Sequence, residues 1–293
     1  MKYLWLYIKM LRVKQWLKNC IIFLPALMYP SLLSFDSIIS LFATFIFFCV
    51  AASMVYIIND WIDRDEDAKH HTKKLRPFAS GELILKDALI AFVLLASIFV
   101  LLCIYFVSFS QELVFLMFLY LFQSFLYSFY LKNITLLEML IVSTGYSYRT
   151  FAGGLSIDLP TSVWMLATIF LASIFMVAQK RLSDINSSED INNLRTSLRL
   201  YPEGFLNLIT GIAASSAIVS FILFTLSDYA EDRFQNEYLP LTSLFIIYAT
   251  FRYIQIAMTS MKGHDPIELI LKDRHLKSCI ILCIFFILFS NVI

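Results

Sequence analysis

The sequence predicts an all-α membrane protein, a polytopic helical bundle with about nine transmembrane helices. Three observations lead to this fold class. Hydrophobic residues make up 59% of the 293 residues, the mean hydropathy is +0.75, and several stretches of about 20 residues carry little or no charge. Such stretches are long enough to cross a hydrocarbon core about 30 Å thick. A backbone in lipid must satisfy its own polar groups, so each spanning stretch should be a helix.

No linker rich in Pro, Gly or Ser divides the chain, so we expect a single transmembrane domain over residues 1–293. Residues 1–11 are basic and aromatic, and they should lie on the membrane surface rather than form a cleavable signal. Pro25 and Pro30 should kink or shorten the first spanning helix. The predicted helices cover residues 15–33, 38–58, 87–107, 112–130, 135–156, 161–179, 204–226, 238–258 and 274–292.

The basic residues predict how the helices are oriented. Nearly all Lys and Arg side chains fall on one set of helix ends, whereas the opposite loops, around residues 31–37, 108–111, 157–160 and 227–237, contain only Arg233. The positive-inside rule then places the N-terminus in the cytoplasm and, after nine spans, the C-terminus outside. We expect a bacterial-type inner (cytoplasmic) membrane, with the functional end of the bundle facing the cytoplasm.

An acidic segment follows the predicted helix 38–58. If the helix continues for two more turns, Asn59, Asp60, Asp63 and Asp67 share one face, because they are three or four residues apart. Oxygen ligands at this spacing suit Mg²⁺, which prefers one or two carboxylates together with phosphate oxygens of a substrate. The alternative is a solvated acidic turn, but acids at a helix C-terminus are unfavourable for the helix dipole.

Cations follow the acids within a dozen residues. Arg76 is the best candidate for a phosphate ligand, because Pro77 fixes the backbone behind it and a guanidinium can bind phosphate through two parallel hydrogen bonds. Lys74 is a further candidate. For this lysine, contact with anionic lipid headgroups is an equally plausible alternative.

Other candidates for substrate binding lie elsewhere in the chain. Arg149 falls inside a predicted span, where a charge is costly and usually marks a functional cavity. Its alternative role is a structural ion pair with Glu138 or Asp60. Lys180 and Arg181 end the predicted helix 161–179, where basic residues are also common for topological reasons. Lys18 and Asn19 lie near the start of the first span.

The acidic pattern resembles the first aspartate motif of the UbiA superfamily of intramembrane prenyltransferases. The matching residues are Asn59, Asp60, Asp63 and Asp67, with Arg76-Pro77 and Ser80-Gly81 behind them. The resemblance implies a nine-helix bundle that binds a Mg²⁺-diphosphate at the aspartates. Most members carry a second aspartate motif after the sixth helix, and residues 180–190 do not contain it.

Further matches resemble the decaprenyl-phosphate phosphoribosyltransferase branch of this superfamily. They are residues 15–19, Arg149 with Ala152-Gly153-Gly154, Lys180-Arg181, residues 263–266 and residues 272–274. In this branch 5-phosphoribose moves from 5-phosphoribosyl 1-diphosphate to a polyprenyl phosphate, which feeds synthesis of cell-envelope glycans. The resemblance implies metal binding by Asp63, Asp67 and Asn59 with support from Asp60, and phosphate binding by the cations named above.

The chemistry of this transfer is consistent with the residues present. A lipid phosphate is ionised at neutral pH and needs no general base, so the enzyme has to position two anions and stabilise the departing diphosphate. Two alternatives stay open. One is a prenyltransferase that uses a prenyl diphosphate and an aromatic or other small acceptor, and the other is a membrane transporter with Arg149 as its binding charge. No nucleic-acid partner is expected.

Overall fold

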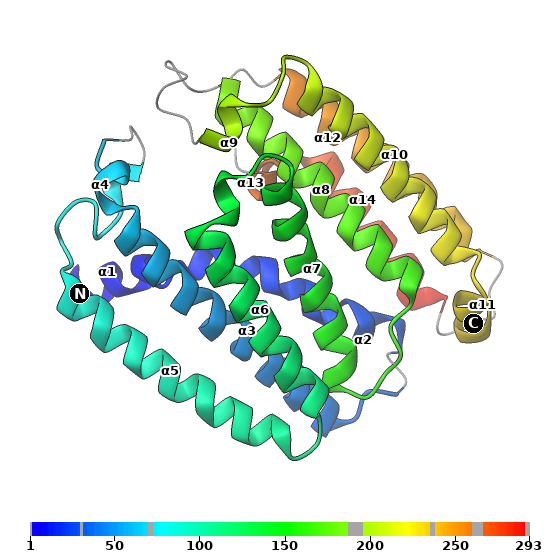
Figure 1. The fold of residues 1–293 in the computed structure, drawn as a ribbon. Helices are drawn as coiled ribbons and strands as arrows, with labels where there is room; N and C mark the ends of the chain where they lie inside the picture. The colour runs from blue at the N-terminus through cyan, green and yellow to red at the C-terminus, as the bar shows by residue number, and fades with distance from the viewer. Residues whose placement is uncertain are drawn as a thin grey trace.

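The computed structural model describes residues 2–29, 32–69, 73–186, 196–234, 238–259 and 266–290 (Figure 1). Over these residues all regular secondary structure is helical, which confirms the all-α prediction. The elements are α1 (Lys2–Met10), η1 (Val13–Phe23), α2 (Leu24–Met28), α3 (Phe35–Ile62), α4 (Arg64–Asp67), η3 (Lys73–Leu75), α5 (Leu85–Val107), α6 (Gln111–Phe129), η4 (Leu131–Asn133), α7 (Leu137–Ser156), α8 (Val163–Asn186), α9 (Thr196–Arg199), α10 (Phe205–Thr225), α11 (Asp228–Phe234), η6 (Leu239–Leu241), α12 (Thr242–Thr259), α13 (Pro266–Lys272) and α14 (Arg274–Phe289).

Six of the described helical segments are long and apolar enough to span a membrane. They are α3, α5, α6, α8, α10 and the continuous segment Leu239–Thr259, which joins η6 to α12. Each coincides with a predicted span, so the prediction of an integral membrane protein is confirmed. Helices α7 and α14 coincide with two further predicted spans, but α7 carries a buried glutamate and arginine and α14 has only 16 residues. The count of nine spans therefore stays a prediction.

The first predicted span, 15–33, is not one continuous α-helix. It consists of the 3₁₀ helix η1 followed by α2, with Pro25 in the first turn of α2. Proline has no amide hydrogen to donate, so it is tolerated at the start of a helix and disrupts its interior. Helix α2 ends at Met28, and Pro30 lies outside the described residues. The prediction that this span is shortened is confirmed for its described part.

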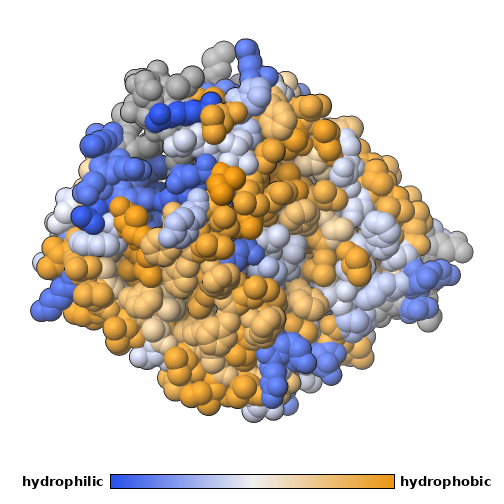
Figure 2. Space-filling model, viewed as in Figure 1, coloured by the Kyte–Doolittle hydropathy of each residue, from blue (hydrophilic) through white to orange (hydrophobic). Residues whose placement is uncertain are grey.

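Much of the molecular surface is apolar. Figure 2 shows hydrophobic side chains over the middle of the molecule and hydrophilic ones gathered near the end that holds α4. Large side chains such as Leu101 of α5 and Phe115 of α6 are about two-thirds exposed. Contiguous exposed apolar surface of this kind is typical of a membrane interface. We call the end of the bundle that holds residues 59–67 the acidic end, and the opposite end the far end.

The largest core cluster joins η1, α2, α3, α5, α6 and α7. Phe47 of α3 is fully buried and packs on Phe99 and Phe106 of α5, at ring-centroid distances of 4.8 and 5.6 Å. Gly153 of α7 explains how η1 comes so close to α7, because a Cβ atom there would lie 1.9 Å from the carbonyl oxygen of Ile22. Small residues at such a position let two helices approach closely.

Candidate functional site

The acidic residues converge at the end of α3 as the spacing predicts. Helix α3 ends at Ile62, but the backbone continues to turn: the amide of Asp63 donates to the carbonyl of Asn59 at 2.9 Å, and the amide of Asp67 donates to the carbonyl of Asp63 at 2.8 Å. The Asn59 side chain also donates to the Asp63 carboxylate at 3.1 Å. The expected uninterrupted helix is thus replaced by two helices that meet at Asp63, and the side chains still face one another.

Two arginines hold the most buried acids of this acidic segment. Asp60 and Asp67 are 4% and 5% exposed, and one nitrogen of Arg76, Nη1, donates to both, at 3.1 Å in the case of Asp60. Arg12, which precedes η1, donates to Asp60 through Nε at 3.0 Å and through Nη2. Fork-like arginine–carboxylate contacts of this type are among the stronger hydrogen bonds in proteins. The predicted candidate Arg76 therefore lies on the acids themselves.

A third cation reaches the acidic residues from a distant part of the chain. Lys132 of η4 extends its ammonium to Asp63 Oδ1 at 2.7 Å, and both side chains are nearly nine-tenths buried. The sequence analysis identified neither Lys132 nor Arg12 as a site residue. A signal for Lys132 was present, because it is the sole Lys or Arg between residues 87 and 148. No comparable signal distinguishes Arg12 from the other basic residues near the N-terminus.

Arg12 adopts a backbone conformation that is unusual for a residue with a side chain. Its φ of 51° and ψ of 45° lie in the left-handed region, which costs roughly 1–2 kcal/mol for an L-residue. The guanidinium stacks over the ring of Tyr56 at 4.7 Å and donates two hydrogen bonds to Asp60. These contacts offset the strain and keep Arg12 at the acidic residues.

The cluster as a whole can bind anions and a metal. Three carboxylates, those of Asp60, Asp63 and Asp67, face three cations, those of Arg12, Arg76 and Lys132. The formal charges balance, so the cluster can accept a metal ion together with an anionic substrate without leaving a large net charge buried. We call these six residues the charged cluster.

The donor atoms of the charged cluster suit Mg²⁺. The described residues contain no group of three or more His, Cys, Asp or Glu side chains arranged to hold a metal by themselves. Mg²⁺ does not require such a group, since it usually takes one or two carboxylates, waters and substrate phosphate oxygens. Asp63 and Asp67 lie one turn apart, and Asn59 contacts Asp63, so these three could supply the protein oxygens.

Arg149 lies deep in the bundle, and no acid contacts it among the described residues. It is 8% exposed and donates to Asn19 Oδ1 at 2.6 Å, to the Gly145 carbonyl at 2.6 Å and to the Tyr120 hydroxyl at 2.9 Å. Its guanidinium also lies 5.6 Å from the ring centre of Phe48. A buried cation whose described contacts are all neutral could accept an anion as a further partner. The predicted candidates Arg149 and Asn19 are thus brought together.

The alternative partners considered for Arg149 were wrong. Glu138 accepts hydrogen bonds from Arg181 at 2.7–3.1 Å, and Asp60 is held by the two arginines of the charged cluster. Glu138 and Arg149 both lie on α7, eleven residues apart, which at 1.5 Å per residue separates them by about 16 Å. Arg149 instead faces η1 and α6, which offer an amide and a hydroxyl.

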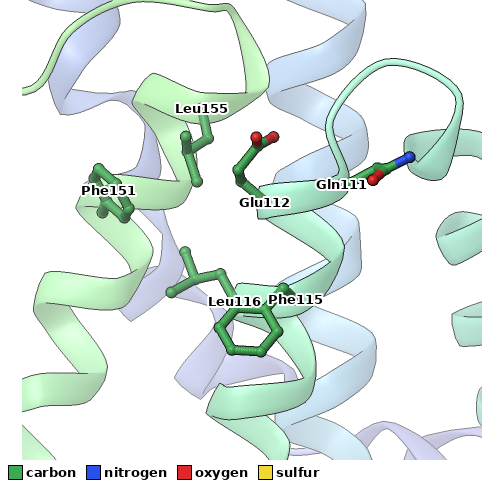
Figure 3. Close-up of a pocket in the computed structure, with 6 residues that line it drawn as sticks. All are labelled: Gln111, Glu112, Phe115, Leu116, Phe151 and Leu155. Atoms are coloured by element: carbon green, nitrogen blue, oxygen red, sulfur yellow. The ribbon is translucent and has the colours of Figure 1, made fainter.

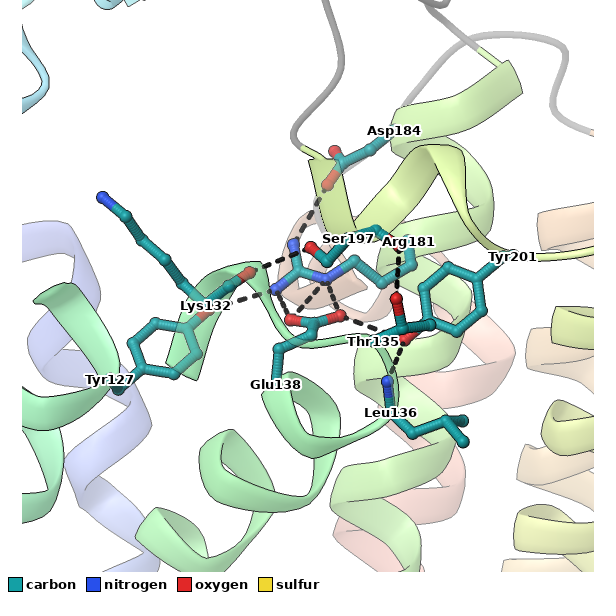
Figure 4. A network of polar contacts seen from close by, with 9 residues as sticks. All are labelled: Tyr127, Lys132, Thr135, Leu136, Glu138, Arg181, Asp184, Ser197 and Tyr201. Atoms are coloured by element: carbon teal, nitrogen blue, oxygen red, sulfur yellow. Dashed lines mark hydrogen bonds and ion pairs between the residues drawn. The ribbon is translucent and has the colours of Figure 1, made fainter. Parts of the chain in front are cut away.

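The other predicted substrate ligands are placed in different surroundings. Arg181 uses its guanidinium on Glu138 and on Asp184, the latter at 3.3 Å, and Figure 4 shows these contacts. This geometry favours a structural ion pair for Arg181, and its phosphate role stays a prediction. Lys74 is exposed on η3, and Lys18 and Lys180 are partly exposed. The matching residues 263–265 lie outside the described residues.

A groove between α6 and α7 lies away from the charged cluster. It has a volume of about 470 Å³ and is lined by Gln111, Glu112, Phe115, Leu116, Phe151 and Leu155 (Figure 3). These residues belong to the N-terminal part of α6 and the C-terminal part of α7, at the far end, whereas η4 with Lys132 follows the C-terminus of α6. None of the six lining residues is a cation, so we assign no phosphate ligand to this groove.

Comparison with known proteins identifies the family. Residues 20–265 match the UbiA prenyltransferase family. The chain is 30% identical to the decaprenyl-phosphate phosphoribosyltransferase of Mycolicibacterium smegmatis over 283 residues, covering 92% of this chain and 87% of the relative. It is 29% identical to the enzyme of the same name from Corynebacterium glutamicum, covering 92% of this chain and 82% of that one. The resemblance found in the sequence is confirmed.

Solved structures agree on the fold. A UbiA homolog from Archaeoglobus fulgidus, solved with DMAPP and Mg²⁺, superposes with a TM-score of 0.70 over 98% of this chain and 99% of its own, at 14% identity. A digeranylgeranylglyceryl phosphate synthase superposes with a TM-score of 0.65 over the full length of both chains, at 17% identity. The sequence match, the shared fold and the membrane helices lead to one conclusion: the chain is an integral membrane transferase of the UbiA prenyltransferase family.

Proposed function

We propose that this protein transfers 5-phosphoribose from 5-phosphoribosyl 1-diphosphate to a polyprenyl phosphate of the decaprenyl type, in a Mg²⁺-dependent reaction that releases diphosphate. The observation that carries the proposal is the charged cluster, in which Arg12, Arg76 and Lys132 converge on acids that suit a metal. The names of the curated relatives support this donor and acceptor. The Mg²⁺ bound to the Archaeoglobus homolog supports the metal.

The reaction needs positioning more than proton transfer. An oxygen of the lipid phosphate forms a bond to the anomeric carbon of ribose while the bond from that carbon to the diphosphate breaks, and the electron pair leaves with the diphosphate. Mg²⁺, when bound, would neutralise part of the charge on the leaving group. Asp63 and Asp67, with Asn59, would hold the metal. The cations of the charged cluster would take up the remaining diphosphate oxygens.

Arg149 is proposed to hold a second phosphate, with Asn19 and Tyr120 orienting its guanidinium. It is twelve residues into α7, which corresponds to about 18 Å from the start of that helix at 1.5 Å per residue. A phosphate there would be enclosed by the bundle, where a charge-assisted hydrogen bond is stronger than in water. Lys18, Lys74 and Lys180 are proposed as outer phosphate contacts.

The placement in the cell follows from the same proposal. We infer one transmembrane unit over residues 1–293 in a bacterial inner membrane, with a cytoplasmic N-terminus, nine spans and an external C-terminus. The acidic end would then face the cytoplasm, where soluble phosphoribosyl diphosphate and Mg²⁺ are found. The product, a polyprenyl-phosphate phosphoribose, would serve the synthesis of cell-envelope glycans.

A prenyltransferase acting on a prenyl diphosphate is the second candidate function. The Archaeoglobus homolog, which shares the fold, was solved with the prenyl diphosphates DMAPP and GPP. The sequence between residues 180 and 201 lacks the second aspartate motif that such enzymes ordinarily carry, which favours phosphoribosyl transfer.

The deciding experiment uses purified protein in detergent or nanodiscs with Mg²⁺, polyprenyl phosphate and labelled phosphoribosyl diphosphate. We expect labelled lipid from the wild type, and none after addition of EDTA or in the Asp67→Ala variant. A parallel reaction with a prenyl diphosphate and an aromatic acid should give no product. Prenylation of the aromatic acid without labelled phosphoribosyl lipid would refute the proposal and favour the second candidate.

A further inference from the structure

Lys132 is held by contacts to both its side chain and its backbone. Its ammonium contacts Asp63, and its backbone carbonyl accepts a hydrogen bond from the Ser197 hydroxyl at 2.9 Å. Ser197 lies on α9, is 1% exposed, and its own carbonyl accepts from the Thr135 hydroxyl at 3.3 Å. In Figure 4 the lysine side chain points away from this network, while its carbonyl faces Ser197.

The turn between η4 and α7 is further held at Leu136. This residue has a φ of 68°, which is costly for any residue except glycine, and its amide donates to the Tyr201 hydroxyl at 3.2 Å. Burial raises the pKa of Tyr201, so its phenol stays a neutral hydroxyl. Glu138, two residues after Leu136 in the chain, forms the ion pair with Arg181. A strained backbone persists only where its surroundings fix it, and such positions gather at functional sites.

We propose that Ser197 is a positioning residue that acts through Lys132. The hydroxyl of Ser197 fixes the carbonyl of Lys132, and so fixes where the lysine side chain leaves the three-residue helix η4. A lysine side chain is long and flexible, and restraining its base reduces the freedom that is lost when its ammonium binds an anion. Ser197 thereby sets the affinity of the charged cluster for the diphosphate group. The inference rests on the proposed function only for the identity of that anion.

The test measures the Kd of inorganic diphosphate in the presence of Mg²⁺, by calorimetry on the full-length protein in detergent. Ser197→Ala should weaken binding about 3- to 10-fold, which corresponds to one neutral hydrogen bond. Thr135→Val, which conserves volume and removes only the reciprocal hydrogen bond, should weaken binding in the same direction. The decisive measurement repeats both changes in a Lys132→Met background, where neither should have a further effect, because the residue they act through is gone.

Ser156→Ala is the matched control. Ser156 is 4% exposed and its hydroxyl also donates to a backbone carbonyl, that of Gly153 at 2.8 Å, but it lies at the far end of α7. It should leave the Kd unchanged. If Ser197→Ala weakens diphosphate binding equally with and without Lys132, the inference is overturned and Ser197 is a structural residue. A wild type that binds no diphosphate would also overturn it. If diphosphate binds with the predicted coupling but no labelled lipid forms, the proposed function alone fails.

Discussion

The same substitution should affect two buried arginines of this protein differently: it should reduce turnover at Arg149 and stability at Arg181. Among the described residues Arg149 bonds only to neutral groups, whereas Arg181 is paired with Glu138, which is 1% exposed. Replacing either residue with methionine removes the charge and keeps an unbranched side chain of similar helix propensity. The substitution in Arg181 leaves an unpaired buried carboxylate. The substitution at Arg149 leaves an amide oxygen, a backbone carbonyl and a hydroxyl without their donor.

The magnitudes follow from these contacts. Removing one partner of a buried ion pair costs about 3–5 kcal/mol, so Arg181→Met should lower the free energy of unfolding by that amount. Arg149→Met gives up three hydrogen bonds, each worth about 1.5–3 kcal/mol because the donor is charged. It also removes a desolvation penalty of several kcal/mol for an unpaired ion. These two contributions are similar in size, so the net change should stay below about 2 kcal/mol.

Thermal unfolding in detergent and turnover with labelled phosphoribosyl diphosphate, measured on the same preparations, test this prediction. Arg149→Met should unfold near the wild-type temperature and lose about 10²–10³-fold in turnover, the loss expected when a buried donor to a reacting anion is removed. Arg181→Met should unfold at a clearly lower temperature. If Arg149→Met instead unfolds earlier than Arg181→Met while its folded fraction keeps full turnover, the anion-receptor role of Arg149 is refuted.

Three further predictions concern the charged cluster and the helix packing behind it. Lys132→Met should raise the KM for the phosphoribosyl donor about tenfold, the equivalent of one charge-assisted contact, and an unchanged KM would exclude Lys132 from the site. The free energy of unfolding of Arg12→Ala should be about 1 kcal/mol lower than that of Arg12→Gly, because both variants lose the contact with Asp60 but only glycine relieves the strain of the left-handed backbone. Equal thermal stability of the two variants would argue against that strain. Gly153→Ala should lower both the unfolding temperature and the turnover, since the added Cβ would lie 1.9 Å from the Ile22 carbonyl oxygen, and a wild-type-like variant would show that η1 can move away freely.

The sequence by itself determined the features that depend only on residues close to one another along the chain. Long uncharged stretches can only be helices in lipid, and in the described part of the chain six helices long and apolar enough to span a membrane lie where spans were predicted. The spacing of Asn59, Asp60, Asp63 and Asp67 is local too, and it brings these side chains together even though α3 ends at Ile62. Proline in the first span shortened its helix for an equally local reason.

The tertiary structure decided which charges meet. Arg12 and Lys132 lie 48 and 69 residues from the acids that they contact, and no periodicity connects them to those acids. The same holds for Arg149, whose partner Asn19 is 130 residues away, and for Glu138, which was considered for Arg149 but pairs with Arg181. Helix packing sets these pairings, as at Gly153, where the missing side chain lets η1 lie against α7. A charge inside a bundle pairs with whatever the adjacent helix presents to it, and that is fixed only when the helices have packed.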